Sequence, residues 1–528
     1  MNLNSEKLAP VFWSVAAGIA LTGAFDNVGI GFLAWFALAF LLLGLRGATV
    51  KEAVYLGLLA SFVHYVTLLY WLVPTMHTYG GLPVVLSVGA LLLLAFYLAL
   101  YVALFSGLVT GFSKHPVFLV FTVPVFWVSL EYLKTFLFSG FPWGLLGYSQ
   151  YRYLHVIQSA DIFGVYGISF FLCAINAAIF VAVLHARGLT WQNNPVGRGG
   201  AVFSIILMAV LFALNVGYGR YKISSMDRVV SESRHLRVSV VQGNIEQFMK
   251  WEDDHIESTV ERYLQLSGQT GTSNPGLIVW PETAMPFYFG QEQHRTSQVM
   301  KAIREMDAWF LIGSPSFEYN QSSGDISFFN SAYLLDPKAR VAGVYDKVHL
   351  VPFGEYVPLG DWLPFVGRMV HSVGDFKPGP SGKTLSMDET GLGIQICYEI
   401  IFPHLSAQMV KNGGNIIINI TNDAWFGDTA GPVQHFSMAV FRSVENRRAL
   451  ARSANNGISA FVDPVGRVIQ RTELFETTQI SRDLPVITNQ YAFYTKHNDL
   501  LPAASTAAAL LFMGVAGLRR KRRKQGGN

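Results

Sequence analysis

The sequence predicts a membrane protein in two parts: a multi-span α-helical membrane domain and a separate α/β domain. Three observations lead to this prediction. Apolar runs long enough to cross a bilayer, which takes about 20 residues, recur through the first part of the chain. Hydrophobic residues make up 51% of the 528 positions and charged residues only 14%. Acidic residues are scarce before Arg220 and frequent after it, so the two parts are expected to have different surroundings.

Eight apolar segments are candidates for transmembrane helices. In chain order they are Leu8–Phe25, Val28–Leu45, Ala53–Leu72, Val84–Phe112, Val117–Tyr132, Ile162–Ala186, Ala201–Tyr218 and Leu501–Leu518. The first seven predict a membrane domain over residues 1–221, and the eighth predicts a final helix with a basic tail over residues 500–528. The polar stretch between them, residues 222–499, is expected to fold on its own.

Lysine and arginine in the short loops predict the orientation of these segments. If the N-terminus is cytoplasmic, the inner loops carry most of the positive charge: Arg46, Lys51, Lys114, Arg187, Arg198 and the tail Arg519–Lys524. Both termini are therefore predicted to be cytoplasmic. The polar domain is predicted to lie outside the inner membrane, which means the periplasm in a Gram-negative cell.

Several classes of function find little support in the sequence. The two cysteines, Cys173 and Cys397, offer no disulfide framework, and no His or Cys spacing suits zinc. No phosphate-binding loop and no serine nucleophile elbow occur. The basic tail abuts an apolar helix and is typical of a topology signal, so nucleic acid is not an expected partner. We expect no metal and no cofactor.

The polar stretch alternates strand-like and helical runs. The predicted strands are Leu236–Val241, Leu277–Trp280, Trp309–Gly313, Asn330–Leu335, Val341–Tyr345, Gly393–Cys397, Asn415–Ile420 and Ile458–Val462. The predicted helices are Glu257–Leu266, Thr296–Met306 and Val433–Ser453. This alternation predicts a layered α/β domain, in which functional groups gather at the carboxyl ends of strands.

Three residues with complementary chemistry follow predicted strands: Glu282, Lys347 and Cys397. A free thiol has a pKa near 8.5 and needs a base or a nearby cation to act as a nucleophile at neutral pH. A carboxylate becomes a better base when burial raises its pKa, and an ammonium can stabilise an oxyanion. The three residues therefore predict covalent catalysis by a cysteine.

Each candidate also has a purely structural interpretation. Cys397 could be a buried core thiol, Glu282 a helix cap or a surface carboxylate, and Lys347 one half of an ordinary salt bridge. Glu355 could pair with Lys347 and fix its direction, or it could be a solvated loop carboxylate. The residues alone leave these alternatives open.

The local context of the three residues resembles the carbon-nitrogen hydrolase (nitrilase) superfamily. The matching pieces are Trp280-Pro281-Glu282, Asp346-Lys347 and Cys397-Tyr398-Glu399. With the apolar segments, the whole chain is similar to the apolipoprotein N-acyltransferases, a membrane-embedded family of that superfamily. Two further stretches, Phe353–Pro358 and Thr421–Gly427, are similar to motifs of the same family. The resemblance implies a nitrilase-like αββα sandwich as the catalytic domain.

The resemblance also implies roles for individual residues. Glu282 would be the general base, Lys347 the oxyanion stabiliser and Cys397 the nucleophile. Glu355 would support the lysine.

The remaining site residues also come from the resemblance. Tyr398 and Glu399 match the family's neighbours of the nucleophile. Trp251 and Trp425 are candidates for substrate binding.

The implied reaction transfers a fatty acyl chain in two steps. Cys397 would take the sn-1 acyl group of a phospholipid, typically phosphatidylethanolamine, as a thioester. The α-amino group of a diacylglyceryl-modified N-terminal cysteine on an apolipoprotein would then receive it, completing lipoprotein maturation. The expected partners are a phospholipid donor, diacylglyceryl apolipoproteins and the lipid bilayer.

Two aromatic or apolar loops have alternative interpretations. Phe136–Tyr153 is either an interfacial anchor or part of a lipid-facing vestibule. Tyr356–Val373 is either an arm that rests at the bilayer interface or a loop that packs against the spans.

Two rival functions are also considered. A membrane-bound amidase or nitrilase would hydrolyse small amides with the same Glu-Lys-Cys triad, but a tether needs one span rather than eight. A transporter with an accessory domain would carry charged residues inside its spans, and these are nearly absent here.

Overall fold

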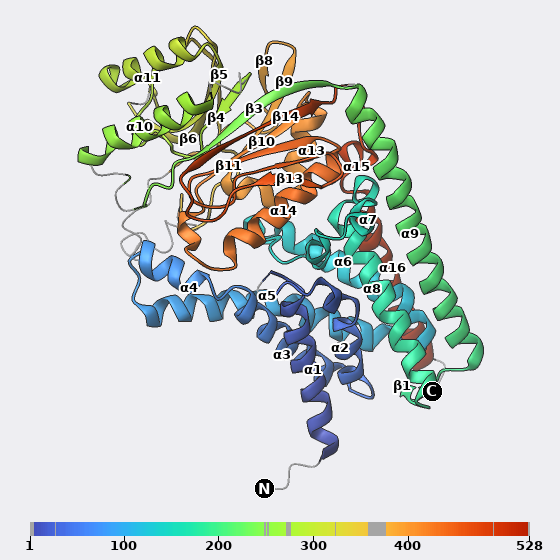
Figure 1. Ribbon diagram of the computed structural model, residues 1–528. Helices are drawn as coiled ribbons and strands as arrows, with labels where there is room; N and C mark the ends of the chain where they lie inside the picture. Colours follow the sequence, from blue (N-terminus) through green and yellow to red (C-terminus); the bar gives the residue numbers. More distant parts are fainter. Residues whose placement is uncertain are drawn as a thin grey trace. The chain divides into compact units, whose positions relative to one another are not determined.

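The computed structural model describes residues 5–525 except 27, 248–249, 251–252, 271–275, 323, 357–375 and 489. The chain divides into two compact units. The first unit comprises Met1–Tyr70, Val88–Lys222 and His497–Asn528, and the second comprises Trp71–Ser87 and Ile223–Lys496. Figure 1 shows the elements of both units with the labels used below.

Within the described residues, four helices are long and apolar enough to cross a membrane. They are Val84–Phe112 (α5), Pro116–Ser139 (η3, α6 and η4), Ala160–Ala186 (α8) and Arg198–Glu232 (α9). The count becomes five if Val50–Leu68 (α3) and Leu72–Tyr79 (α4 and η2) form one broken span. Two more apolar helices are shorter, Leu8–Gly23 within α1 and Leu500–Val515 within α16. The predicted count of eight is therefore not confirmed.

One predicted span is wrong as a continuous helix. Residues of the segment Val28–Leu45 form a short turn of helix, η1 (Gly31–Trp35), followed by α2 (Ala37–Leu45). Gly29, with a φ of 80°, precedes this pair in a left-handed conformation that interrupts a helix. The nine residues of α2 extend about 14 Å, which is half the thickness of a bilayer core.

A buried amide from α8 holds the chain at this break. Asn176 donates to the Ala34 carbonyl oxygen over 2.9 Å and accepts from the Ala39 backbone N–H over 3.1 Å. These bonds pair backbone groups next to the break, which an apolar environment would otherwise leave unsatisfied. Cys173 lies one turn earlier on α8 and is fully buried.

The remaining helical and strand segments outside the α/β sandwich are short or terminal. They are α1 (Ser5–Gly23), η5 (Leu146–Gln150), α7 (Leu154–Ile157), β1 (Thr190–Trp191), β2 (Asn194–Pro195), α15 (Phe493–Lys496) and α16 (Leu500–Gln525).

The second unit contains two six-stranded sheets. The first has the order β14-β3-β4-β5-β6-β7. Its strands are β3 (Arg234–Gln242), β4 (Leu277–Val279), β5 (Trp309–Tyr319), β6 (Ile326–Leu335), β7 (Val341–Asp346) and β14 (Thr478–Val486). β3, β4 and β5 run parallel, and the other neighbours run antiparallel.

The second sheet has the order β13-β12-β11-β10-β9-β8. Its strands are β8 (Leu385–Met387), β9 (Thr390–Ile396), β10 (Ile416–Thr421), β11 (Ala449–Ala454), β12 (Ala460–Val462) and β13 (Val468–Arg471). The central strands β9, β10 and β11 are parallel, so their carboxyl ends share one edge of the sheet.

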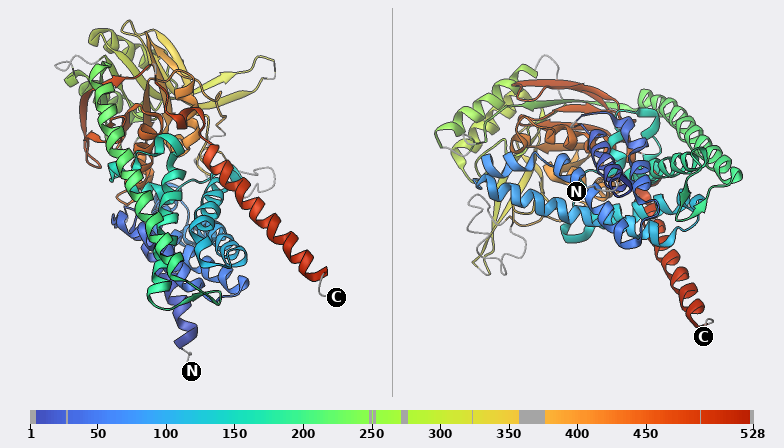
Figure 2. Two further views of the ribbon diagram at one scale, coloured as in Figure 1. Left: turned by 90° about the vertical axis from the view of Figure 1, so that its right-hand side faces the viewer. Right: turned by 90° about the horizontal axis from the view of Figure 1, so that it is seen from below.

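The two sheets pack face to face through one apolar core. Alternate residues of each strand point into it, for example Val238 and Val240 from β3 and Ile416, Ile418 and Ile420 from β10. Helices α10 (Asp253–Gly268) and α11 (Gln293–Met306) lie side by side and cover the outer face of the first sheet (Figure 2). Helices α13 (Pro403–Lys411) and α14 (Gly431–Asn446) pack on the second sheet. The predicted αββα sandwich is confirmed.

One predicted helix extends too far. Val433–Ser453 was expected to be a single helix, but α14 ends at Asn446 and β11 begins at Ala449. Arg447 adopts a left-handed φ of 51°, which stops the helix. The residues that follow are buried on both sides between β10 and β12, a position that overrides their helical propensity.

Candidate active site

Cys397 lies at the turn between a buried strand and a helical turn. β9 ends at Ile396, and Cys397 is the first residue of η8 (Cys397–Ile401). Its φ is 52°, a left-handed conformation that a side chain with a Cβ adopts only when its surroundings impose it. Cys397 as a residue is partly exposed, unlike the fully buried Cys173.

Glu282 follows β4 and is held by three hydrogen bonds. Its Oε1 accepts from Asn330 Nδ2 at 2.8 Å and from Lys347 Nζ at 3.4 Å. Its Oε2 accepts from the backbone N–H of Asn422, which follows β10, at 2.9 Å. The Glu282 side chain is 8% exposed, so its position is fixed by these partners rather than by solvent.

Lys347 follows β7 and faces two carboxylates. Its Nζ lies 2.9 Å from Glu355 Oε1 and 3.4 Å from Glu282 Oε1. Burial alone favours the neutral amine, but the charges of Glu355 and Glu282 raise the pKa of Lys347 above its ordinary value. The ammonium therefore stays charged and cannot act as a base at neutral pH.

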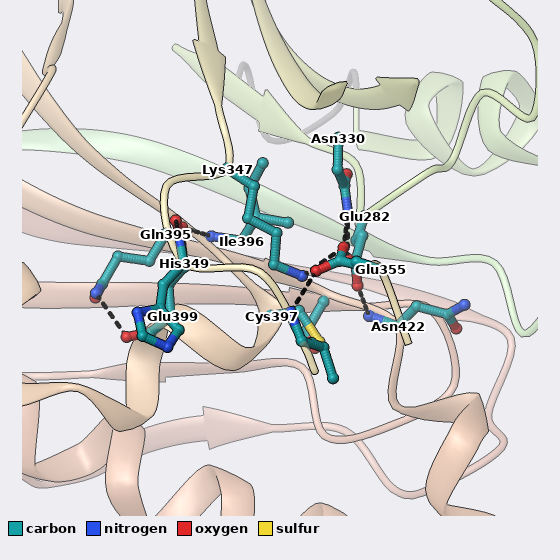
Figure 3. A network of polar contacts seen from close by, with 12 residues as sticks. Glu282, Asn330, Lys347, His349, Glu355, Gln395, Ile396, Cys397, Glu399 and Asn422 are labelled. Carbon is teal, nitrogen blue, oxygen red and sulfur yellow. Dashed lines mark hydrogen bonds and ion pairs between the residues drawn. The ribbon is translucent and has the colours of Figure 1, made fainter. Parts of the chain in front are cut away.

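Figure 3 shows the Cys397 side chain beside those of Lys347, Glu282 and Glu355. Burial raises the pKa of the Cys397 thiol, and the negative charge of Glu282 raises it further, while Lys347 opposes the shift. The resting residue is therefore a thiol rather than a thiolate. Attack on a substrate by this residue would need a base to remove that proton.

Glu355 is the carboxylate that pairs with the lysine, rather than a solvated one. Its Oε1 faces Lys347, and its Oε2 accepts the backbone N–H of Val351 at 2.8 Å. The side chain is 12% exposed. Of the two interpretations left open by the sequence, the structure supports the pairing.

Asn330, which the sequence analysis did not select, connects the two glutamates. Its Nδ2 donates to Glu282 Oε1 at 2.8 Å and to Glu355 Oε1 at 2.9 Å. The backbone carbonyl oxygen of Asn330 accepts the Lys347 backbone N–H at 2.8 Å. The signal that could have revealed it is a lone amide within β6, which otherwise consists of apolar residues and serines.

Glu399 is buried beneath the site, two residues after the cysteine. Its carboxylate accepts the backbone N–H groups of Ile396, Val348 and His349 and the hydroxyl of Tyr345. It therefore connects the turn that carries Cys397 to the loop that carries Lys347 (Figure 3).

Tyr398 is almost fully buried next to the nucleophile. Its ring packs edge-on against Phe402 at a centroid distance of 5.2 Å and lies 5.9 Å from His349. Burial raises the pKa of its phenol above the ordinary value. Tyr398 is therefore a neutral packing residue in the resting site.

Lys250 is a second buried ammonium that the sequence analysis missed. It is 1% exposed, and its Nζ donates to the Glu282 carbonyl oxygen at 3.1 Å. Burial lowers the pKa of Lys250 to about 8, against the opposing charges of Glu282 and Cys397. Its partner is a backbone oxygen over 30 positions away, which no local pattern reveals. Trp251, predicted as a substrate-binding residue, lies outside the described residues.

Trp425 lies on η9 (Asp423–Phe426), directly after β10. It is partly exposed, and its ring meets that of Tyr79 edge-on at a centroid distance of 5.9 Å. The neighbouring Phe426 packs edge-on against Trp71 at 4.8 Å. A cluster of aromatic rings, of which Trp71 is buried, therefore borders the loop that supplies the Asn422 N–H to Glu282. Most of the predicted arm Tyr356–Val373 lies outside the described residues.

Two family models match the chain. Residues 17–178 match the apolipoprotein N-acyltransferase N-terminal domain, and residues 237–490 match the carbon-nitrogen hydrolase family. The second match covers every strand of the sandwich except the first residues of β3. All the site residues described above lie within it.

Curated relatives match over nearly the full length. An apolipoprotein N-acyltransferase from Geobacter metallireducens is 40% identical over 96% of this chain and 95% of its own. One from Pasteurella multocida is 30% identical over 98% of this chain and 97% of its own. Among solved structures, an amidase from Nesterenkonia sp. has 18% identity and a TM-score of 0.36, covering 48% of this chain and 92% of its own.

Proposed function

Because the chain belongs to the apolipoprotein N-acyltransferase family, we propose that it acylates lipoproteins through a thioester on Cys397. The family and its apolar helices make it a membrane-bound N-acyltransferase of the carbon-nitrogen hydrolase superfamily. The observation that carries the finer proposal is the meeting of three groups at strand ends. The Lys347 ammonium lies 3.4 Å from the Glu282 carboxylate, and Cys397 lies beside both.

The first step loads the enzyme. Glu282 takes the proton of the Cys397 thiol as sulfur attacks the sn-1 carbonyl carbon of a phospholipid, and Lys347 faces the oxyanion of the tetrahedral intermediate. Collapse breaks the ester bond. The departing alkoxide receives the proton from Glu282 and leaves as a lysophospholipid, with the acyl group bound to sulfur as a thioester. The raised pKa of Cys397 supports proton removal during attack rather than a preformed thiolate.

The second step transfers the chain. The neutral α-amino group of a diacylglyceryl-modified N-terminal cysteine attacks the thioester carbon and gives a proton to Glu282. Sulfur then leaves and is protonated again, so the enzyme returns to its starting state. The product is an amide at the lipoprotein N-terminus. The two half-reactions share one acyl-enzyme, so ping-pong kinetics are expected.

Substrate identity and placement complete the proposal. Phosphatidylethanolamine is the proposed acyl donor, and Trp251 and Trp425 are proposed to contact the substrates. The sandwich is proposed to lie on the periplasmic side of an inner membrane, with both termini cytoplasmic. The positive charge of the short inner loops and of the tail Arg519–Lys524 supports this orientation.

A mass measurement tests the acyl-enzyme directly. Purified protein is incubated with phosphatidylethanolamine labelled in the sn-1 chain, without acceptor, and its peptides are analysed by mass spectrometry. We expect one fatty-acyl addition on the peptide that contains Cys397, and its loss when a diacylglyceryl peptide is added.

Variants supply the controls for that measurement. Cys397→Ala should carry no label while keeping its thermal unfolding midpoint, and Glu282→Gln should form the thioester far more slowly. Label at an unchanged rate in Cys397→Ala would remove the mechanism. Hydrolysis of small amides, with no thioester from phospholipid, would instead indicate a membrane-bound amidase.

A further inference from the structure

A row of buried polar side chains crosses the outer face of the second sheet. Gln395, Asn419 and Arg452 occupy paired positions on β9, β10 and β11. Each is fully buried, whereas the residues on either side of them in the strands are mostly apolar. The Asn419 side chain donates to the backbone carbonyl oxygen of Gln395 at 3.0 Å and accepts a hydrogen bond from Arg452. Buried polar rows are costly unless they hold something in place.

The row ends in an ion pair with no access to water. Arg452 Nη2 lies 2.7 Å from Asp423 Oδ2, and both side chains are fully buried. The Thr421 hydroxyl also donates to Asp423, at 3.0 Å. Burial opposes ionisation of the acid, yet Arg452 and His435 hold the pKa of Asp423 below its usual range. A buried pair of this kind adds little net stability but fixes geometry.

His435 on α14 is the residue that this pair orients. Its Nδ1 lies 3.0 Å from Arg452 Nη2 and 3.1 Å from Asp423 Oδ1, and its Nε2 lies 3.2 Å from the carbonyl oxygen of Cys397. A carbonyl oxygen only accepts, so Nε2 carries the proton. Burial and the charge of Arg452 lower the pKa of His435, so the ring is neutral and Nδ1 accepts from the guanidinium. Nδ1 then has no proton for Asp423, so the carboxylate acts on the ring by holding Arg452 in place.

The bond from His435 therefore falls on a residue whose backbone is left-handed. Cys397 has a φ of 52°, and a strained turn persists only where the surrounding contacts determine it. Fixing its carbonyl oxygen fixes the plane of the following peptide bond. This restricts ψ of Cys397 and therefore the directions open to the Cα–Cβ bond that carries the thiol. We propose that His435, oriented by Arg452, which Asp423 holds in place, is a positioning residue that keeps Cys397 in the conformation required for attack.

This inference rests on the proposed function, because it assumes that Cys397 is the nucleophile. It assigns to His435 no contact with substrate and no proton transfer. Its effect is on the rate at which a folded enzyme is acylated, because a displacement of about 1 Å in a reacting group costs roughly 100-fold.

Single-turnover acylation with labelled phosphatidylethanolamine separates the rate of acylation from the fraction of chains that become acylated. The variants are His435→Leu, which removes the donor, and His435→Gln, whose side-chain amide can still donate to the Cys397 carbonyl oxygen. The matched control is His294→Gln on the exposed side of α11. Two quantities are measured: the fraction of chains finally acylated and the rate constant for reaching it.

We expect His435→Leu to be acylated to the same final fraction as the wild type but about 10-fold to 100-fold more slowly. His435→Gln should recover most of the rate, and His294→Gln should match the wild type. If His435→Leu does not fold, His435→Asn replaces it, because its shorter amide cannot reach the carbonyl oxygen.

Three results would overturn the inference. The first is a wild-type rate in the variant without the donor. The second is an equally slow rate with glutamine and leucine, and the third is a reduced fraction with an unchanged rate, which means a purely structural role. Failure of the proposed function is distinguishable, because then the wild type forms no thioester or Cys397→Ala still becomes labelled.

Discussion

The carboxylate of Glu399 accepts the backbone N–H of Val348, the residue directly after the lysine of the site. The same carboxylate accepts the N–H of Ile396, the residue directly before the cysteine, at 2.6 Å. One buried side chain thus holds the two loops that carry Lys347 and Cys397. Their separation depends on this acid although it does not face the reacting atoms.

Glu399→Gln should weaken both the fold and the activity. An amide that keeps one oxygen presents an NH₂ group to at least one backbone N–H, and each unsatisfied buried donor costs about 1–3 kcal/mol. We expect a lower thermal unfolding midpoint and a slower rate of acyl-enzyme formation per folded molecule. Glu305→Gln, on an exposed position of α11, is the matched control. Full activity with an unchanged midpoint would contradict the connecting role.

Glu399 should also make stability depend on pH. Burial raises the pKa of Glu399 to about 7, against the lowering effect of the backbone N–H groups of Ile396 and Val348. The unfolded chain has a value of about 4.3. Because the folded state binds the proton more tightly, the contribution of Glu399 is complete below about pH 4.3 and is lost as the pH rises through 7.

The difference in unfolding free energy between the wild type and Glu399→Gln should therefore be largest in acid. It should change by up to about 4 kcal/mol by neutral pH. Thermal unfolding in detergent at a series of pH values measures it. A constant difference across this range would show that Glu399 does not titrate there.

Asn330 should be as important for the rate of acyl-enzyme formation as the two glutamates that it connects. Asn330→Leu removes both hydrogen bonds, and a hydrogen bond to a charged group is worth about 1.5–3 kcal/mol. We expect acyl-enzyme formation to slow by roughly 10-fold to 100-fold. Asn330→Asp, which places a third carboxylate beside Glu282 and Glu355, should be slower still. If the aspartate variant instead retains the wild-type rate, the amide donor is not what holds the two glutamates.

Lys347→Met tests the cation of the site. Removing one buried partner leaves Glu282 and Glu355 without their counter-charge, which costs about 3–5 kcal/mol of stability. Loss of an oxyanion donor lowers the acylation rate by about 100-fold or more. Lys383→Met, at an exposed position before β8, controls for the loss of a lysine. The measurements are thermal unfolding and single-turnover acylation, and a loss of stability without a loss of rate would leave Lys347 a structural role alone.

Lys250 should set the alkaline limit of the reaction. Burial lowers the pKa of Lys250 to about 8, so its charge beside Glu282 and Cys397 disappears above that pH. A neutral amine no longer favours the charged forms of its neighbours, and the acylation rate should fall as the pH rises through about 8. The fall in acylation rate should be absent in Lys250→Met. It should remain in Lys301→Met, which changes a lysine at an exposed position of α11. The same fall in Lys250→Met would assign it to another group.

The catalytic candidates could be selected from the sequence because each follows a recognisable strand and lies in a motif that resembles the nitrilase superfamily. Glu282, Lys347 and Cys397 follow β4, β7 and β9, whose apolar runs are clear even without a structure. The partners that hold them could not be identified in the same way. Asn330 and Lys250 reach the site from distant segments, and the contacts depend on sheet order and side-chain direction. Short sequence patterns reveal neither the order of strands in a sheet nor the direction of a side chain.

The membrane segments show a similar division. The long helices α5 and α8 were predicted closely, because their apolar runs have few interruptions. The break between η1 and α2 was missed, because Asn176 of α8 satisfies backbone groups that hydropathy alone assigns to a continuous helix. β11 was missed for the opposite reason, since its helix-favouring sequence is placed between two strands. The proposed division at residues 222 and 499 remains a prediction from the sequence.

The burial of Cys173 within α8 has a practical consequence. The chain holds one other sulfhydryl, and that one is accessible in part. A small alkylating dye added to the folded protein should therefore attach at position 397 rather than at 173, and slowly at neutral pH, because the raised pKa of Cys397 keeps it a thiol. Labelling of Cys397 can therefore be used to count folded enzyme molecules in a detergent extract.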